Sequence, residues 1–563
     1  MEEEICIFND NLQYCSSNHS IMKQLNLDLS DQNLDKQNIT NLVQALGKCI
    51  NLKSLTLDLS KNMINQEQIS DIGTALTCCK NLTSLILNLS CNQFEEKFDL
   101  SAIFCNCVSL ISLKLYIQHT KMNLEGKPNL SQTFIYCQKL TSLCLNLRSN
   151  GIGTSGAQDL SMALSNCINL EDLTLLLYGN SVDKQGATYL GQAFSKLILM
   201  KKLALDFQSN QIQNEGIIAL CSAFRNYQNL DSLDLNLIDN SISNEGLAEI
   251  GTVIRCCQQI VNLNLKLYKN DIGASGAAKL GIALEDCPNL KFCTLDLEKN
   301  KIGEQGEFGF DKAFSNSLNL TTLILNLNSN NINNHYTQGL SRALKNCTNL
   351  KYLDLTLKWN KINQEGICIF KQGLANCKNL TELRLVIACG NDIQAKGAEE
   401  LGESLGQLIH LNQLILDFEV FYTPGAIGSQ GIQHLITPLR NCTQLEMLVL
   451  GLHQNQLGTQ GVILLGQALR NCQNLKNLEL VLSSNFISGE GLVELANGLG
   501  HCTNLSSLAI FLRYNRMINL DDVISFGRAL KNCINLTSLK TDLCLDNTIC
   551  FQKIPRLVQV YLV

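Results

Sequence analysis

The sequence predicts an α/β solenoid with a parallel sheet on one side and helices on the other. The first observation is a fixed period, because an asparagine recurs every 30 residues from Asn150 to Asn360, seven steps over 210 residues. The second is that each period holds a short alternating apolar stretch followed by an apolar pattern typical of a helix. A period of this length marks a repeat protein, in which each unit covers its apolar side by stacking on its neighbours.

Residues 140–170 show one unit in full. Leucines alternate with other residues across 143–147, which predicts a strand with one buried face. Ser-Asn-Gly at 149–151 predicts a turn, because asparagine tolerates left-handed backbone angles and its side chain bonds backbone groups. Apolar residues at helical spacing across 156–167 predict a short helix. One unit is therefore strand, turn, helix and turn.

The repeated pattern L-x-x-L-x-L-x-L-x-x-N-x-I-x-x-x-G-A-x-x-L-x-x-A-L-x-x-C-x-N-L resembles the leucine-rich repeat of the ribonuclease-inhibitor subclass. The resemblance implies a right-handed horseshoe, with the parallel sheet on the concave face and helices on the convex face. We count about 17 or 18 repeats of 30 residues. The unit has one more L-x step before the asparagine than is usual in that subclass, which predicts a concave strand longer by one in–out pair.

One continuous repeat array is predicted over residues 21–547. Residues 1–20 are expected to form an N-terminal cap or a degenerate repeat, and the apolar residues 548–563 a C-terminal cap or tail. The register gains one residue near 388–391. A larger interruption near 418–427 adds four residues and removes the asparagine.

The 26 cysteines predict buried free thiols rather than disulfides. Many occupy one slot of the repeat, and Leu197, Tyr227 and Leu408 fill that slot in other units. A slot that accepts leucine requires a buried hydrophobe, a role that free cysteine fills well. No secretory signal and no run of 18 apolar residues is evident. We therefore expect the cytoplasm or another reducing intracellular compartment.

Composition and motifs argue against several functions. The net charge of −6 gives no indication of a nucleic-acid or membrane partner. The glycines of 151–156 match the dinucleotide-loop pattern G-x-G-x-x-G, but the equivalent stretches 211–216 and 271–276 lose one or two of them. We interpret the match as part of the repeat pattern. No nucleophile–base set and no metal-ligand spacing is gathered in one segment. We predict no enzyme activity, catalytic residue, metal, cofactor or small-molecule substrate.

Side chains between the strand leucines are expected to face the concave side. From residue 28 to residue 326, the second of these positions is mostly Asp or Asn. This predicts either lateral hydrogen bonds between stacked side chains or an acidic surface for a basic partner.

The C-terminal third carries apolar residues at the concave positions instead. An exposed apolar patch marks a binding site. The alternative explanation is that strand propensity favours valine and isoleucine at these positions. The interruption near 418–427 adds two aromatic residues without a core slot. A further candidate is the only tryptophan with the lysine before it, since tryptophan is enriched in binding hot spots. The predicted partner-binding residues are Lys358, Trp359, Val386, Ile415, Phe421, Tyr422, Val449, Val481 and Phe511.

The predicted function is a non-catalytic protein–protein interaction scaffold that holds a macromolecular partner, of unknown identity, on its concave face. Two alternatives stay open. The chain resembles Ran GTPase-activating proteins and ribonuclease inhibitors in repeat type, which implies regulation of an enzyme, although the strongly acidic tail usual in such activators is not evident. It could also be the ligand-sensing array of a signalling complex, although no nucleotide-binding or death-type domain accompanies it.

Overall fold

The computed structural model describes residues 5–8, 21–92, 94, 100–105, 107–120, 131–303, 309–421, 425–515, 517–543, 556–557 and 559–562. They divide into two compact units, Met1–Asp271 and Ile272–Val563, each of which is described by itself.

In the first unit, the described strands lie side by side in chain order and pair in parallel. They are β1 (Ile5–Phe8), β2 (Gln24–Asp28), β3 (Ser54–Asp58), β4 (Ser84–Asn88), β5 (Ser112–Tyr116), β6 (Ser142–Asn146), β7 (Asp172–Leu176), β8 (Lys202–Asp206), β9 (Ser232–Asn236) and β10 (Asn262–Lys266). The helices that follow them are α2 (Lys36–Leu46), α3 (Gln66–Leu76), α4 (Ser101–Phe104), α5 (Gly153–Leu164), α6 (Lys184–Phe194), α7 (Gln213–Phe224) and α8 (Asn244–Cys256).

The second unit repeats this arrangement, again with parallel strands in chain order. Its described strands are β11 (Phe292–Asp296), β12 (Thr322–Asn326), β13 (Tyr352–Thr356), β14 (Glu382–Val386), β15 (Gln413–Asp417), β16 (Met447–Gly451), β17 (Asn477–Val481), β18 (Ser507–Phe511), β19 (Ser538–Thr541) and β20 (Gln559–Leu562). Its described helices are α9 (Ala274–Glu285), η2 (Gly309–Lys312), α10 (Asn334–Asn346), α11 (Gln364–Leu374), α12 (Gln394–Leu405), α13 (Gly428–Ile436), η3 (Thr437–Asn441), α14 (Gly458–Leu469), α15 (Gly489–Leu499), α16 (Leu520–Ala529) and η4 (Leu530–Asn532).

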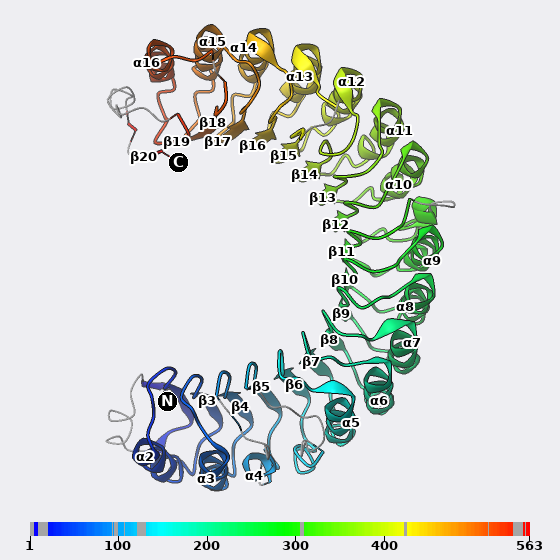
Figure 1. Cartoon of the computed structure of the whole chain (residues 1–563), viewed down its shortest axis with the longest axis vertical. Coiled ribbons are helices and arrows are strands. Elements are labelled where there is room, and N and C mark those ends of the chain that lie inside the picture. Colours follow the sequence, from blue (N-terminus) through cyan, green and yellow to red (C-terminus); the bar gives the residue numbers. More distant parts are fainter. Residues whose placement is uncertain are drawn as a thin grey trace. The chain divides into compact units, whose positions relative to one another are not determined.

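Within each unit the strands form one layer and the helices the other (Figure 1). The predicted α/β solenoid with a parallel sheet is therefore confirmed. The strand leucines and the apolar residues of the helices point into the space between the layers and form the core. We call the other face of the sheet, which no helix covers, the open strand face.

The 30-residue period sets the pairing of neighbouring strands. Leu143 of β6 lies opposite Leu173 of β7, so that identical slots stack on one another. Pairing continues past the end of β6, because the Leu147 amide donates to the Leu176 carbonyl at 2.9 Å and the Ser149 amide to the Tyr178 carbonyl at 2.9 Å. The backbone ladder thus extends beyond the five residues of each strand.

The repeated asparagine holds the turn after each strand. Asn180 is fully buried, and its Oδ1 accepts hydrogen bonds from the amides of Asn150 at 2.9 Å and Ile152 at 3.3 Å. Its Nδ2 donates to the Leu147 carbonyl at 2.8 Å. One side chain therefore satisfies backbone groups of the preceding repeat that would otherwise be buried without partners.

The cysteine slot of the repeat lies beside the helix ends. The Cys257 thiol donates to the Phe224 carbonyl at 3.5 Å, and the Tyr227 hydroxyl, in the same slot, donates to the Phe194 carbonyl at 2.8 Å. Burial raises the pKa of Cys257 to about 12. The cysteines in the described part of the chain are all free, as predicted for a buried apolar slot.

The two interruptions change the offset between strands as the sequence indicates. Glu382 pairs with Gln413 and Gln413 with Met447, so the offsets are 31 and 34 residues instead of 30. Near the ends of the chain, β1 pairs with β2 and β20 with β19. The limits of the caps, at residues 20 and 548, stay predictions. None of the helices formed by the described residues has the length and apolar character needed to cross a bilayer.

Candidate functional site

The open strand face carries a ladder of polar side chains. Asn88 Nδ2 donates to Asp58 Oδ2 at 2.8 Å. In the second unit, Asn326 Nδ2 donates to Asp296 Oδ1 at 2.9 Å, and Thr356 Oγ1 donates to Asn326 Oδ1 at 2.7 Å. The lateral hydrogen bonds predicted for stacked Asp and Asn side chains are therefore confirmed.

Arginines neutralise several of the acids on this face. Arg148 donates from Nε and Nη2 to Asp206 Oδ2, at 3.1 and 2.6 Å, across two repeats. Arg384 Nη1 donates to Asp354 Oδ1 at 2.9 Å. These pairs reduce the acidity that the concave column shows in sequence, which weakens the hypothesis of an acidic surface for a basic partner.

The predicted apolar patch is partly wrong. Val386 is only 3% exposed and does not face a partner. Lys358 Nζ and Asp417 Oδ2 form an ion pair at 2.6 Å. They belong to the repeats on either side of Val386, and Thr356, Val386 and Asp417 are in register on adjacent strands. The ion pair therefore joins the two repeats on either side of the repeat that holds Val386.

The other apolar residues of the predicted patch lie on the open strand face as two pairs. Ile415 is in register with Val449, and Val481 with Phe511. All four are half-buried, but the pairs occupy different columns, and Glu479 follows Val449 in its column. The patch is thus two small apolar areas rather than one continuous surface.

The structure brings together two candidates that are separate in sequence. We call the residues that meet at the C-terminal ends of β13–β16 the turn cluster; it consists of Lys358, Trp359, Cys389, Asp417, Glu419, Phe421 and His453. Asp417 pairs with Lys358, and the Phe421 ring lies 5.0 Å from the His453 ring between centroids. Tyr422, the remaining predicted residue, lies outside the described residues.

Trp359 occupies the left-handed turn position that serine or lysine fills in several other repeats. Its side chain is 54% exposed, and its backbone is left-handed with φ 56°. Gly390 of the next repeat also has a left-handed φ, 79°, and a Cβ there would lie 2.6 Å from the Trp359 Cα. The glycine in the one-residue insertion therefore makes room for the tryptophan turn.

Partial burial sets the protonation of the turn cluster. Burial raises the pKa of Glu419, as does neighbouring Asp417, while the Lys358 ammonium opposes the shift. Burial lowers the pKa of His453, so the ring is neutral at pH 7. Burial also raises the pKa of the Cys389 thiol, which disfavours the reactive thiolate. This chemistry suits recognition rather than nucleophilic attack.

Sequence reasoning missed Cys389, Asp417, Glu419 and His453. The available signal was their place at the ends of the consecutive strands β14, β15 and β16 or in the turns that follow them. Among the residues that the structure describes, no group of three His, Cys, Asp or Glu side chains is arranged to hold a metal ion.

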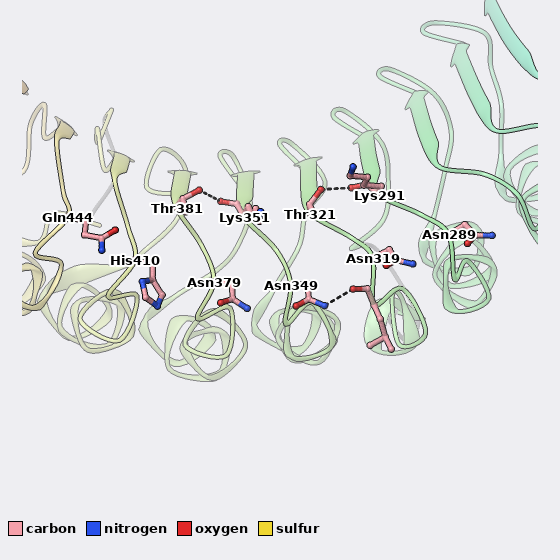
Figure 2. Close-up of a pocket in the computed structure, with 11 residues that line it drawn as sticks. Asn289, Lys291, Asn319, Thr321, Asn349, Lys351, Asn379, Thr381, His410 and Gln444 are labelled. Carbon is pink, nitrogen blue, oxygen red and sulfur yellow. Dashed lines mark hydrogen bonds between the residues drawn. The ribbon is translucent and has the colours of Figure 1, made fainter.

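A groove of about 800 Å³ crosses the opposite edge of the second unit's sheet, where the chain enters the strands (Figure 2). Its lining residues are Asn289, Lys291, Leu318, Asn319, Thr321, Asn349, Lys351, Asn379, Thr381, His410 and Gln444. The Nδ2 groups of the middle asparagines donate to carbonyls of the preceding repeat at 2.7–2.9 Å, from Asn319 to Pro288, Asn349 to Leu318 and Asn379 to Thr348. Sequence reasoning missed this groove, although the Asn-Leu pair before each strand was its signal.

Comparisons with known proteins agree with this architecture. The family model for the leucine-rich repeat matches residues 136–161 and 203–221. The structure of the Leptospira interrogans leucine-rich-repeat protein LIC12759 is similar with a TM-score of 0.52 and 18% identity, over 94% of this chain and 98% of that chain. A chain of the TLR13–ssRNA13 complex aligns over 96% of this chain and 77% of that chain, with a TM-score of 0.42 and 16% identity. No curated protein matches the sequence.

Identity at this level carries information on the fold alone. The fold, the repeat pattern and the matched family model nevertheless agree with one another. The chain is a leucine-rich-repeat protein.

Proposed function

We propose that this chain is a non-catalytic scaffold that binds a protein partner on the open strand face of its second unit. The repeat pattern supports the ribonuclease-inhibitor subclass as the closest repeat type. The site is a surface of laterally bonded side chains, and such preorganised groups lose little entropy when a partner docks.

The observation that carries the proposal is the exposure of Trp359 at the edge of the turn cluster. A half-exposed tryptophan in a left-handed turn, next to a half-buried ion pair and the tilted Phe421–His453 ring pair, has the composition of an interface hot spot. Ile415, Val449, Val481 and Phe511 extend this surface across β15–β18. Lys358 contributes through the packing of its ion pair.

A protein partner in a reducing intracellular compartment fits the cysteines. Buried free thiols recur along both units, and oxidising compartments favour disulfides. Nucleic acid is disfavoured as a partner of this face, because its Arg384 is paired with Asp354.

Affinity purification of the full chain from a cell extract, read by mass spectrometry, tests the proposal. The variant combining Trp359→Ala, Phe421→Ala and Phe511→Ala is expected to lose the partner recovered with the parent chain. Loss of at least about tenfold is expected, because hot-spot truncations cost roughly 2 kcal/mol or more.

The matched control combines Lys269→Ala with Ile168→Ala. Lys269 occupies the same left-handed turn slot as Trp359, and Ile168 is an exposed apolar residue of the first unit. This control should retain the partner. Equal recovery with the triple variant and the parent would show that the turn cluster is not the site. Stimulation of GTP hydrolysis by a small GTPase would contradict the scaffold function and favour an enzyme regulator.

A further inference from the structure

The groove at the strand-entry edge of the second unit is lined by positive and neutral side chains. Lys291 and Lys351 are exposed along it, and its lining contains no aspartate or glutamate. The whole chain, in contrast, has a net charge of −6. The groove is therefore a local concentration of positive charge on an acidic protein.

In two other repeats the lysine of this slot is paired with a glutamate. Lys201 pairs with Glu171, and Lys476 with Glu446, each at 2.8 Å and each with the residue in the preceding repeat's slot. The residues before Lys291 and Lys351 in the slot are Val261 and Thr321. Among the described residues, no carboxylate forms an ion pair with Lys291 or Lys351. Their charges are left for a partner to neutralise.

The shape of the groove selects an extended chain. Its lining spans the connections into β11 through β16, five strand spacings or roughly 24 Å. An extended polypeptide of about seven residues covers that length. Lys291 and Lys351 stand before β11 and β13, which lie two strand spacings or roughly 10 Å apart. From there their flexible side chains can reach acidic side chains two or three residues apart in an extended peptide.

The remaining lining groups suit a peptide. Thr321 Oγ1 donates to the Lys291 carbonyl at 3.2 Å, and Thr381 Oγ1 to the Lys351 carbonyl at 3.1 Å, so hydroxyls alternate with ammonium groups along the floor (Figure 2). Hydroxyl and amide groups match the hydrogen-bonding needs of a peptide backbone. A single nucleic-acid strand requires aromatic stacking platforms and a cation for most phosphates, and this lining holds one histidine ring and no Phe, Tyr or Trp ring.

We propose that this groove binds an acidic, extended peptide segment, with Lys291 and Lys351 pairing with its carboxylates. This second site lies at the strand edge opposite the turn cluster. The proposal names acidic peptides as a class of ligand for the scaffold, and it does not depend on binding at the open strand face.

Fluorescence anisotropy with the full chain tests the proposal. The probe is a fluorescein-labelled alternating glutamate–serine peptide of about ten residues, slightly longer than the groove. The parent chain should bind it, and added salt should weaken binding because the contacts are ionic. The double variant Lys291→Glu with Lys351→Glu should bind at least about tenfold more weakly, because like charges then face each other.

Lys23→Glu with Lys53→Glu is the matched control. These exposed lysines occupy the same slot in adjacent repeats of the first unit, and the change in net charge is identical. The control should bind the probe within about twofold of the parent, a difference well under 1.4 kcal/mol. Lys291→Arg with Lys351→Arg should also retain binding. Trp359→Ala should leave binding of the probe peptide intact. The groove proposal and the open strand face proposal can therefore fail independently of each other.

Several results would overturn the proposal. One is equal weakening by the two glutamate pairs, which would indicate a general charge effect. Another is equal binding of a glutamine–serine peptide. A third is tighter binding of a thymidine oligonucleotide of matching length, which would assign the groove to nucleic acid. If the glutamate pair fails to fold by circular dichroism, Lys291→Gln with Lys351→Gln replaces it, with the same expected direction.

Discussion

At the scale of single residues, the repeat is held by buried polar side chains rather than by leucine alone. Each turn asparagine both accepts from amides and donates to carbonyls of the preceding repeat, as Asn180 does for Leu147, Asn150 and Ile152. A leucine in this slot would leave those backbone groups buried without partners, at a cost of roughly 1–3 kcal/mol each. This explains why the slot is polar in an otherwise apolar core.

Asn180→Ala is therefore expected to lower the free energy of unfolding by on the order of 3 kcal/mol. Urea denaturation followed by circular dichroism measures the change. The control is Asn169→Ala, since Asn169 is exposed and makes one bond, from Nδ2 to the Gln138 carbonyl at 2.8 Å. The control should cost about 1 kcal/mol or less. Equal destabilisation by both variants would contradict the role assigned to the buried asparagine.

The cysteine slot leads to a second prediction at this scale. Cys256 is exposed, whereas its neighbour Cys257 is buried with a pKa raised to about 12. Iodoacetamide at pH 8 should alkylate Cys256 in the native protein and leave Cys257 unmodified. Burial blocks access of the reagent to Cys257, and its reactive thiolate forms only as the pH approaches the raised pKa. Mass spectrometry of the peptides measures both. In urea without reductant both should react, and a Cys257 that stays unreactive there would point to a disulfide.

At the scale of secondary-structure elements, the strands are alike in most repeats, and the turns differ from one repeat to another. The Asn-containing turns place non-glycine residues at left-handed angles in many repeats, and most of these residues are polar. Trp359 departs from this pattern, and Gly390 is the compensating feature because a Cβ would collide with the tryptophan backbone. The turn cluster thus depends on two neighbouring turns that accommodate each other.

Gly390→Ala should destabilise the chain by about 2 kcal/mol or more and change the fluorescence of Trp359, the only tryptophan. Thermal melts and emission spectra measure the two effects. Gly428→Ala is the control, because Gly428 has a left-handed φ of 64° with nothing within 4 Å of the added Cβ. Backbone strain alone predicts a cost of about 1 kcal/mol and unchanged emission for this control. Unchanged emission in Gly390→Ala would contradict the contact.

At the scale of the whole molecule, stability is carried from one repeat to the next, because each repeat contacts mainly its neighbours. Local weak points are therefore expected where a repeat has little helix. The helix after β4 is α4, of four residues, whereas the helix after β7 is α6, of 11 residues. Among the described residues, less helix surface covers the sheet near β4 than near β7.

Hydrogen–deuterium exchange read by mass spectrometry should show faster amide exchange in β4 than in β7, because local opening requires less buried surface to be exposed. The two strands have the same length and the same burial pattern, so they form a matched pair. Equal protection of β4 and β7 would indicate that the array unfolds as one cooperative body and that helix length does not set local stability.

The sequence by itself determined the period, the parallel strands, the buried thiols and the stacking of the Asp and Asn column. Each of these follows from residues in one slot, such as Asp58 and Asn88, which a constant offset places side by side. It also located the two interruptions, since a change of offset is visible as a shift of the leucines.

The tertiary structure alone decided which residues of different slots meet. Lys358 and Asp417 lie 59 residues apart, and their side chains form an ion pair across two repeats. Val386, which the strand pattern alone placed in the open, is buried, and the Trp359 amide donates to the Cys389 carbonyl within the turn cluster. Long side chains reach across two repeats, so contacts of this kind depend on strand curvature and rotamers that periodicity does not encode.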